Sequence, residues 1–111
     1  MIHIIRDKAA PAQIKEMLEM LKSYIKLAVD IDREIVAGGG AMHADCEAVL
    51  LDDESQQEFI WGPDWDPTAQ LVTFESLINI RPRQHNPSME ILDPAIREKV
   101  AKIVLKRLGD I

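Results

Sequence analysis

The chain has 111 residues, of which 47% are hydrophobic and 29% charged, so we expect one folded domain and not a disordered chain or two separate cores. A single cysteine excludes an internal disulfide, and no stretch is apolar over the length that spans a membrane. The net charge is −6, and no Lys or Arg lies between Arg33 and Arg81. This acidic middle of the chain argues against nucleic-acid binding there.

The first quarter of the chain predicts a short strand followed by a helix. Residues 1–5 are typical of a strand, and they lack the pattern of a signal peptide. Pro11 suits the first position of a helix. Apolar residues then recur at spacings of three and four, which predicts a helix over residues 11–24 with one buried face. The residues of this face are Ile14, Met17, Leu18, Leu21 and Ile25.

The central half of the chain predicts closely spaced strands. Apolar and polar side chains alternate there, with breaks at turn-forming residues such as the three glycines of residues 38–40. A loop over residues 62–68 separates the last two strands. Strands that follow one another so closely favour an antiparallel meander. The predicted strands cover residues 26–31, 35–37, 42–51, 57–61 and 70–81.

The end of the chain predicts a second helix. Asp93 is a good N-cap, Pro94 a good first helical residue, and Gly109 suits the end of the helix. We therefore expect a single α+β domain over residues 1–111. It would consist of an antiparallel β-meander of about five strands, with the N-terminal and C-terminal helices packed on one face and the other face open to water or partly covered.

Strand geometry over residues 42–51 gathers ionisable side chains on one face of the predicted sheet. His43, Asp45 and Glu47 share that face, because successive side chains of a strand point to opposite sides. These three are the candidate catalytic residues, with His43 or Glu47 moving a proton. Cys46 falls on the opposite face, where we expect it to be buried and unreactive.

A divalent metal is one interpretation of this cluster. His43 and Asp45 stand two residues apart on the predicted strand, a spacing at which two ligands can share an ion. A third ligand would come from a neighbouring strand, with Asp30, Glu58 and Glu75 as candidates. The alternative is a surface strand whose carboxylates pair with arginines. No organic cofactor is indicated.

The strand predicted over residues 70–81 supplies the candidate ligand-binding residues. Glu75, Asn79 and Arg81 share one of its faces, and Arg83 follows closely. The two arginines have the planar forks that bind a small anionic ligand, whereas the simpler interpretation is that Arg81 neutralises Asp45 or Glu47. Trp65, on the predicted loop, is a further candidate for ligand contact.

Three stretches of the sequence are distinctive. They are GGGAMHADCE at residues 38–47, IWGPDW at 60–65 and SLINIRPRQ at 76–84. In them the chain resembles a small bacterial family that is classed as a domain of unknown function, and the resemblance spans nearly the whole chain. It implies a free-standing domain of about this length and transfers no activity, cofactor or catalytic residue.

Two classes of function stay open at this point. The first is a cytoplasmic protein-interaction domain that binds a partner protein or forms a homodimer, through its acidic sheet or its basic last helix. The second is a small enzyme or ligand-binding protein that uses the polar sheet face, with a divalent metal or an anionic ligand. Neither a membrane nor nucleic acid is an expected partner.

Overall fold

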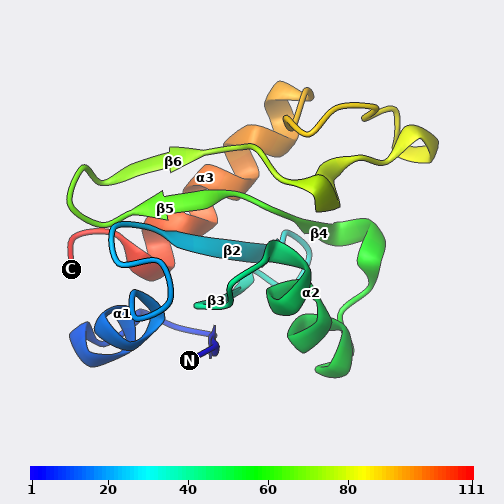
Figure 1. Cartoon of the computed structure of the whole chain (residues 1–111). Helices are drawn as coiled ribbons and strands as arrows, with labels where there is room; N and C mark the ends of the chain where they lie inside the picture. Colours follow the sequence, from blue (N-terminus) through cyan, green and yellow to red (C-terminus); the bar gives the residue numbers. More distant parts are fainter.

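The structure, a computed structural model, describes all 111 residues and has three α-helices and six strands (Figure 1). Short 3-10 turns lie before β4 and after β6. In chain order the elements are β1 (His3–Ile5), α1 (Pro11–Met17), β2 (Ile25–Asp30), β3 (Ile35–Gly38), α2 (His43–Asp52), η1 (Gln57–Phe59), β4 (Ile60–Trp61), β5 (Asp64–Asp66), β6 (Leu71–Thr73), η2 (Leu77–Asn79), η3 (Pro82–Gln84) and α3 (Pro94–Leu108).

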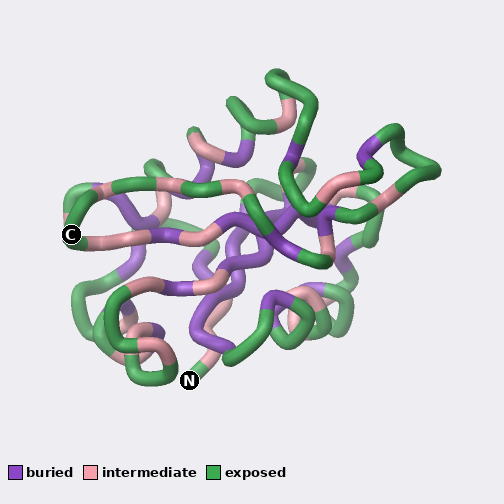
Figure 2. Tube along the Cα trace, turned by 45° about the horizontal axis from the view of Figure 1, so that its top comes forward, coloured by how far each residue is buried: buried purple, intermediate pink, exposed green.

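The six strands form one antiparallel sheet, which confirms the predicted α+β class. Its order is β1-β3-β2-β5-β6, and β4 also pairs with β2. Strand β2 is the centre of the sheet, because it pairs with β3, β4 and β5 along its length. Figure 2 shows the buried part of the chain concentrated on this central strand and its neighbours.

One face of the sheet packs against α1 and α3, as the sequence predicts. Alternate residues of β2, among them Leu27 and Val29, point into the larger hydrophobic core. Met17 of α1 and Val104 of α3 belong to the same core, so the two terminal helices share this face. The cap residues of α3 are also as predicted, since the Asp93 carboxylate accepts a hydrogen bond from the Ala95 N–H at 2.8 Å.

The opposite face of the sheet is partly covered, by α2, a helix that is not among the predicted elements. Ala28 of β2 and Ala37 of β3 pack there against Cys46 and Leu50, all four fully buried. The two latter residues belong to α2, which lies across β2 and β3. The domain therefore has a helix on each side of the sheet, and small alanines on the strands let α2 approach closely.

The strand predicted over residues 42–51 is wrong, because this segment forms α2. Helix α2 buries His43, Cys46 and Leu50, which recur at helical spacing. Ala, Glu and Leu, which make up half of the segment, favour helices over strands. At its start the Asp45 carboxylate accepts a hydrogen bond from the Met42 N–H at 3.1 Å. The apolar residues of this segment fit both the alternation of a strand and the spacing of a helix. Helix propensity together with the Asp45 cap favours the helix.

Other element boundaries also differ from the predictions. Helix α1 ends at Met17 and not near residue 24, and the predicted loop over residues 62–68 contains β5. The strand predicted over residues 70–81 is confined to Leu71–Thr73. Beyond β6 the chain leaves the sheet and forms two 3-10 turns. None of the helices has the length and apolar character needed to cross a lipid bilayer.

Candidate functional site

Helix α2 presents two ionisable side chains to the segment that follows β6. His43 and Glu47 are four residues apart, so they lie one above the other on the same face of the helix. Each lines a separate cleft, and Leu77 and Ile78 line both clefts. Asp45 has a local role at the start of the helix, where it bonds Met42. The helical geometry therefore separates Asp45 from the other two residues.

The His43 ring is held in one orientation by two oxygens from the start of β5. Its Nε2 atom lies 2.8 Å from Asp64 Oδ1 and 3.2 Å from the carbonyl oxygen of Pro63. Because both neighbours are acceptors, Nε2 is the nitrogen that carries the proton. Nδ1 makes no hydrogen bond, and the protein does not enclose it completely. In the neutral ring, Nδ1 is thus an acceptor with access to the cleft.

The cleft beside His43 has a volume of about 310 Å³. The strand register places Asp64 in the wall of this cleft. In the pairing of β5 with β2, Asp64 lies opposite Lys26 on the α2 side of the sheet, whereas Trp65 faces the larger core. We call it the smaller cleft. Its lining residues are Lys26, Met42, His43, Ala44, Asp64, Glu75, Ser76, Leu77, Ile78 and Met89.

One turn along α2, Glu47 forms an ion pair with Arg81. Arg81 Nη2 lies 3.3 Å from Glu47 Oε2, and the two side chains are only 9% and 12% exposed. Burial raises the pKa of Glu47 above its ordinary value, although the positive charge of Arg81 opposes the shift. Burial also lowers the pKa of the Arg81 guanidinium, against the effect of Glu47. The pair supports the interpretation that Arg81 neutralises Glu47.

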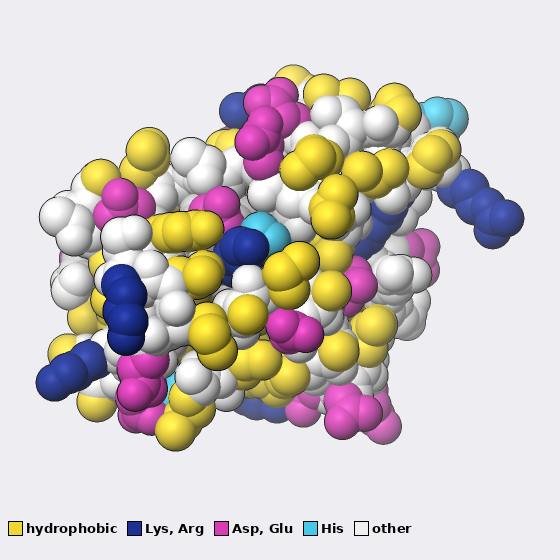
Figure 3. Space-filling model, in the orientation of Figure 1, with side chains coloured by type: hydrophobic (Ala, Val, Ile, Leu, Met, Phe, Trp, Pro, Cys, Tyr) yellow, Lys and Arg dark blue, Asp and Glu magenta, His cyan; other side chains and the backbone are white.

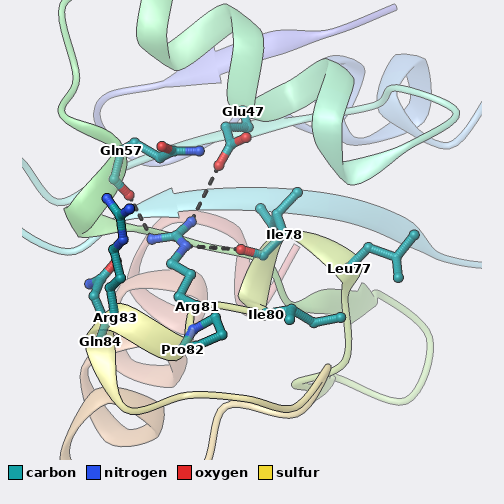
Figure 4. Close-up of a pocket in the computed structure, with 9 residues that line it drawn as sticks. All are labelled: Glu47, Gln57, Leu77, Ile78, Ile80, Arg81, Pro82, Arg83 and Gln84. Carbon is teal, nitrogen blue, oxygen red and sulfur yellow. Dashed lines mark hydrogen bonds and ion pairs between the residues drawn. The ribbon is translucent and has the colours of Figure 1, made fainter.

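Arg81 also connects three parts of the chain. Its guanidinium donates to the carbonyl oxygens of Ile78 at 3.0 Å and of Gln57 at 2.6 Å (Figure 4). It also lies over the Trp61 ring, 4.9 Å from the ring centroid. Donors that already serve Glu47 and two carbonyls leave few free for a ligand. Arg81 is therefore first a structural residue, which fixes the wall of the cleft.

Arg81 and Glu47 line the larger of the two clefts, with a volume of about 530 Å³ (Figure 4). Arg83, which is exposed and forms no ion pair, adds a free positive charge to this wall. We call it the larger cleft. Its lining residues are Glu47, Gln57, Leu77, Ile78, Ile80, Arg81, Pro82, Arg83 and Gln84.

The chain between β6 and α3, residues 74–93, forms one wall of both clefts and is held from inside by two buried amides. Asn79 is fully buried, accepts from the Gly62 N–H at 2.8 Å and donates to the carbonyl oxygens of Gly62 and Met89. Asn86 is 3% exposed and likewise bonds only backbone groups. We call residues 74–93 the display segment.

The approach of the display segment to the sheet depends on Gly62. A Cβ atom at this position would lie 2.8 Å from both Ser76 Cβ and Ile78 Cγ1, closer than side chains pack. The Asn79 amide pairs with both backbone groups of the same glycine. The glycine in IWGPDW and the asparagine in SLINIRPRQ therefore meet in space.

Four large apolar side chains that line the two clefts are well exposed. Leu77 is 62% exposed, Met42 49%, Ile80 44% and Met89 43%. In Figure 3 hydrophobic side chains gather on the side of the molecule that carries α2 and the display segment. We call the two clefts together with these four side chains the groove.

The groove collects five of the residues that the sequence singles out and leaves three elsewhere. His43, Glu47, Glu75, Arg81 and Arg83 line one cleft or the other. Asp45 caps α2, Asn79 holds the backbone of the display segment, and Trp65 is fully buried in the larger core. Trp65 therefore offers no surface for ligand contact. Cys46 is fully buried, and burial raises the pKa of its thiol.

The pairing of His43 and Asp45 as metal ligands depended on strand geometry. The structure brings Asp64, and not Asp45, to His43. It contains no group of three or more His, Cys, Asp and Glu side chains arranged to hold a metal ion.

Sequence reasoning missed Asp64 and the exposed apolar side chains of the groove. Asp64 and Asp66 flank the buried Trp65, and this alternation is a signal of a short strand with Asp64 on the face opposite Trp65. Leu77, Ile80 and Met89 alternate irregularly with buried Asn79 and Asn86, so no sequence period marks them as exposed.

A comparison with protein-family models matches residues 3–107 to the family described as protein of unknown function DUF5674. The match covers nearly the whole chain, and the chain belongs to this family. No curated protein and no solved structure matches the chain.

Proposed function

We propose that this chain is a bacterial, cytoplasmic interaction domain, one domain over residues 1–111, which binds a protein chain in the groove. The single cysteine, buried and unpaired, fits a reducing compartment. The groove is the surface that carries the proposal. It combines exposed apolar side chains with a rigid backbone and with charges at its two ends.

The display segment buries polar side chains and exposes apolar ones, and this observation supports the function most directly. An irregular connection of about 15 residues or more is uncommon in a compact domain unless it has a function. Here such a connection buries the polar Asn79 and Asn86 and exposes Leu77, Ile80 and Met89. The backbone bonds of the two amides keep the segment in place, so the apolar side chains are presented with little entropic cost on binding.

The size and chemistry of the groove favour a protein partner. Clusters of exposed apolar side chains on a soluble surface are typical of contact sites, and arginines are enriched among the residues that dominate interface energies. The two clefts are adjacent and offer places for two neighbouring side chains of a partner. Their walls are held by the Glu47–Arg81 and His43–Asp64 pairs, so the clefts exist before a partner binds.

Site-specific photocrosslinking in the source cells tests this function. A benzoylphenylalanine replaces Ile80 in the groove or, as the matched control, Leu71, which is 55% exposed in the β5–β6 hairpin. We expect a discrete crosslinked protein, another chain or a second copy, from position 80 and none from position 71. Loss of the product on adding Leu77→Asp would locate the contact in the groove. Equal products from both positions, or none, contradict the proposal.

A second candidate function, ligand binding or catalysis in the smaller cleft, is favoured by the His43–Asp64 pair. A carboxylate that orients a histidine leaves Nδ1 ready to accept a proton or to bind a metal. Lys26 on the same wall suits the carboxylate of a small anionic ligand. Glu47 and Arg83 are candidates for the same role in the larger cleft.

Thermal-shift titrations separate this candidate from the first. Zinc chloride, manganese chloride and a set of small carboxylates are added to the wild-type protein, to His43→Gln and to the control His85→Gln. A ligand-dependent rise in Tm that disappears only in His43→Gln supports a site in the smaller cleft. Identical curves for all three proteins remove the candidate.

A further inference from the structure

The two ends of the groove carry opposite charges. The smaller cleft contains Asp64, Glu75 and Lys26, which sum to −1 with a neutral His43, and Glu90 adds a further exposed carboxylate beside Glu75. The larger cleft contains Arg81, Arg83 and Glu47, which sum to +1. Between the two ends lie Leu77 and Ile78, which both clefts share. The groove is therefore negative at one end, apolar in the middle and positive at the other end.

Four of these charges form no ion pair within the molecule, namely Lys26, Glu75 and Glu90 at one end and Arg83 at the other. Glu75 and Arg83 are both exposed, and neither forms an ion pair, whereas Asp64 bonds His43 and Glu47 bonds Arg81. Glu75 is two residues before Leu77, and Arg83 is six residues after it. Glu75 lines only the smaller cleft and Arg83 only the larger one, so these two charges lie on opposite sides of Leu77 and Ile78, which line both.

A surface of this kind is complementary to itself. Consider two copies related by a two-fold axis that passes through the apolar centre, perpendicular to the line between the two ends. The negative end of each copy then lies against the positive end of the other. Each Glu75 then faces the Arg83 of the opposite copy, and this pairing occurs twice. The apolar side chains meet at the axis and the charges lie at the rim, which is the usual arrangement of a specific interface.

We propose that the occupant of the groove is a second copy of this chain, bound about a two-fold axis near Leu77 with reciprocal Glu75–Arg83 pairs. This inference rests on the proposed function, because it names the protein chain that the groove takes. The charge pattern favours a second copy over other partners. Only a contact between two copies requires the two ends of the same groove to carry complementary charges. Leu77 and Ile78 supply the apolar centre, with Ile80 on the side of the larger cleft and Met42 and Met89 on the side of the smaller one.

Charge reversal tests the pairing, with dimer dissociation measured by sedimentation equilibrium. Glu75→Arg places two arginines against each other at both rims, and Arg83→Glu does the same with two carboxylates. Each single variant is expected to weaken the dimer about tenfold or more, because like charges at a contact are unfavourable. The double variant Glu75→Arg/Arg83→Glu restores opposite charges at both contacts and regains the affinity of the wild type.

A mixture of the two single variants gives a second measurement, which shows that both are folded. In a mixed dimer of Glu75→Arg with Arg83→Glu, each rim contact joins an arginine of one copy to a glutamate of the other, so both contacts are attractive. Native mass spectrometry of the equimolar mixture is expected to show the heterodimer in excess over both homodimers. Glu19→Arg and Lys15→Glu, exposed on or beside α1 and outside the groove, are the controls and leave the dimer unchanged.

Three results would overturn the inference. They are a wild-type protein that is monomeric at all concentrations, a dimer that neither single variant weakens, and a double variant that fails to recover. The crosslinking experiment separates these failures from a failure of the proposed function. A monomer that still crosslinks to another protein from position 80 removes the second copy and keeps the interaction domain, whereas a monomer without a crosslink removes both.

Discussion

Several polar side chains that looked like ligand-binding residues hold the backbone instead. Asn79 closes the display segment onto Gly62, and Arg81 connects Glu47 to the carbonyl oxygens of Ile78 and Gln57. Buried polar groups of this kind specify one conformation, because each of them has a partner only when the segment is in place. At this scale the residues of the motifs act mainly through the geometry that they impose.

Replacement of Asn79 by alanine is expected to cost about 2–4 kcal/mol of unfolding free energy, because both backbone groups of Gly62 lose their partner in a buried place. Chemical denaturation measures the loss. Gln84→Ala is the matched control, since that exposed amide makes one bond to the Glu58 carbonyl oxygen, and its removal should change stability by less than about 0.5 kcal/mol. Equal effects of the two substitutions would contradict the role of Asn79.

Glu47 makes stability depend on pH in a direction that its raised pKa fixes. The folded state binds the Glu47 proton more tightly than the unfolded state, so this group stabilises the fold below its unfolded pKa and loses that contribution as pH rises through the folded pKa. Between about pH 4 and pH 7, the wild type should therefore lose unfolding free energy relative to Glu47→Gln, which does not titrate. Urea denaturation across this range measures the difference. A difference that is flat or grows with pH refutes the assignment.

At the scale of elements, the sequence predicts the parts whose local signals agree. The cap residues and apolar stripe of α3 fix its position, and the alternation in β2 fixes that strand. Helix α2 is the main error, because residues 42–51 satisfy the period of a strand and of a helix together. The sheet face that α2 covers is built from distant residues, and no local pattern reports it.

Ala48, exposed in the middle of α2, distinguishes helix from strand at this segment. In a helix Ala48→Gly costs about 1 kcal/mol and Ala48→Val about 0.5 kcal/mol, because alanine is the best helix former. In a strand the valine substitution would instead be neutral or stabilising. Thermal unfolding of the two variants measures both effects, and a valine variant more stable than the wild type argues for a strand.

At the scale of the whole molecule, the groove joins elements that are far apart in the sequence. Helix α2, the start of β5 and the display segment meet because β2 pairs with both β4 and β5. His43, Glu47, Glu75, Arg81 and Arg83 are all visible in the sequence, yet their division between two clefts depends on this pairing. Strand order is a long-range property, so sequence patterns give the residues of the site but not its shape.

The mass of the Leu77→Asp variant in solution tests the central claim, that the groove is the contact surface between two copies. Light scattering is expected to give twice the chain mass of 12.5 kDa for the wild type and for Leu71→Asp, the control outside the groove, and the mass of one chain for Leu77→Asp. A carboxylate at the apolar centre is costly to bury without a partner. A Leu77→Asp protein that keeps the same mass as the wild type at every concentration would contradict the account.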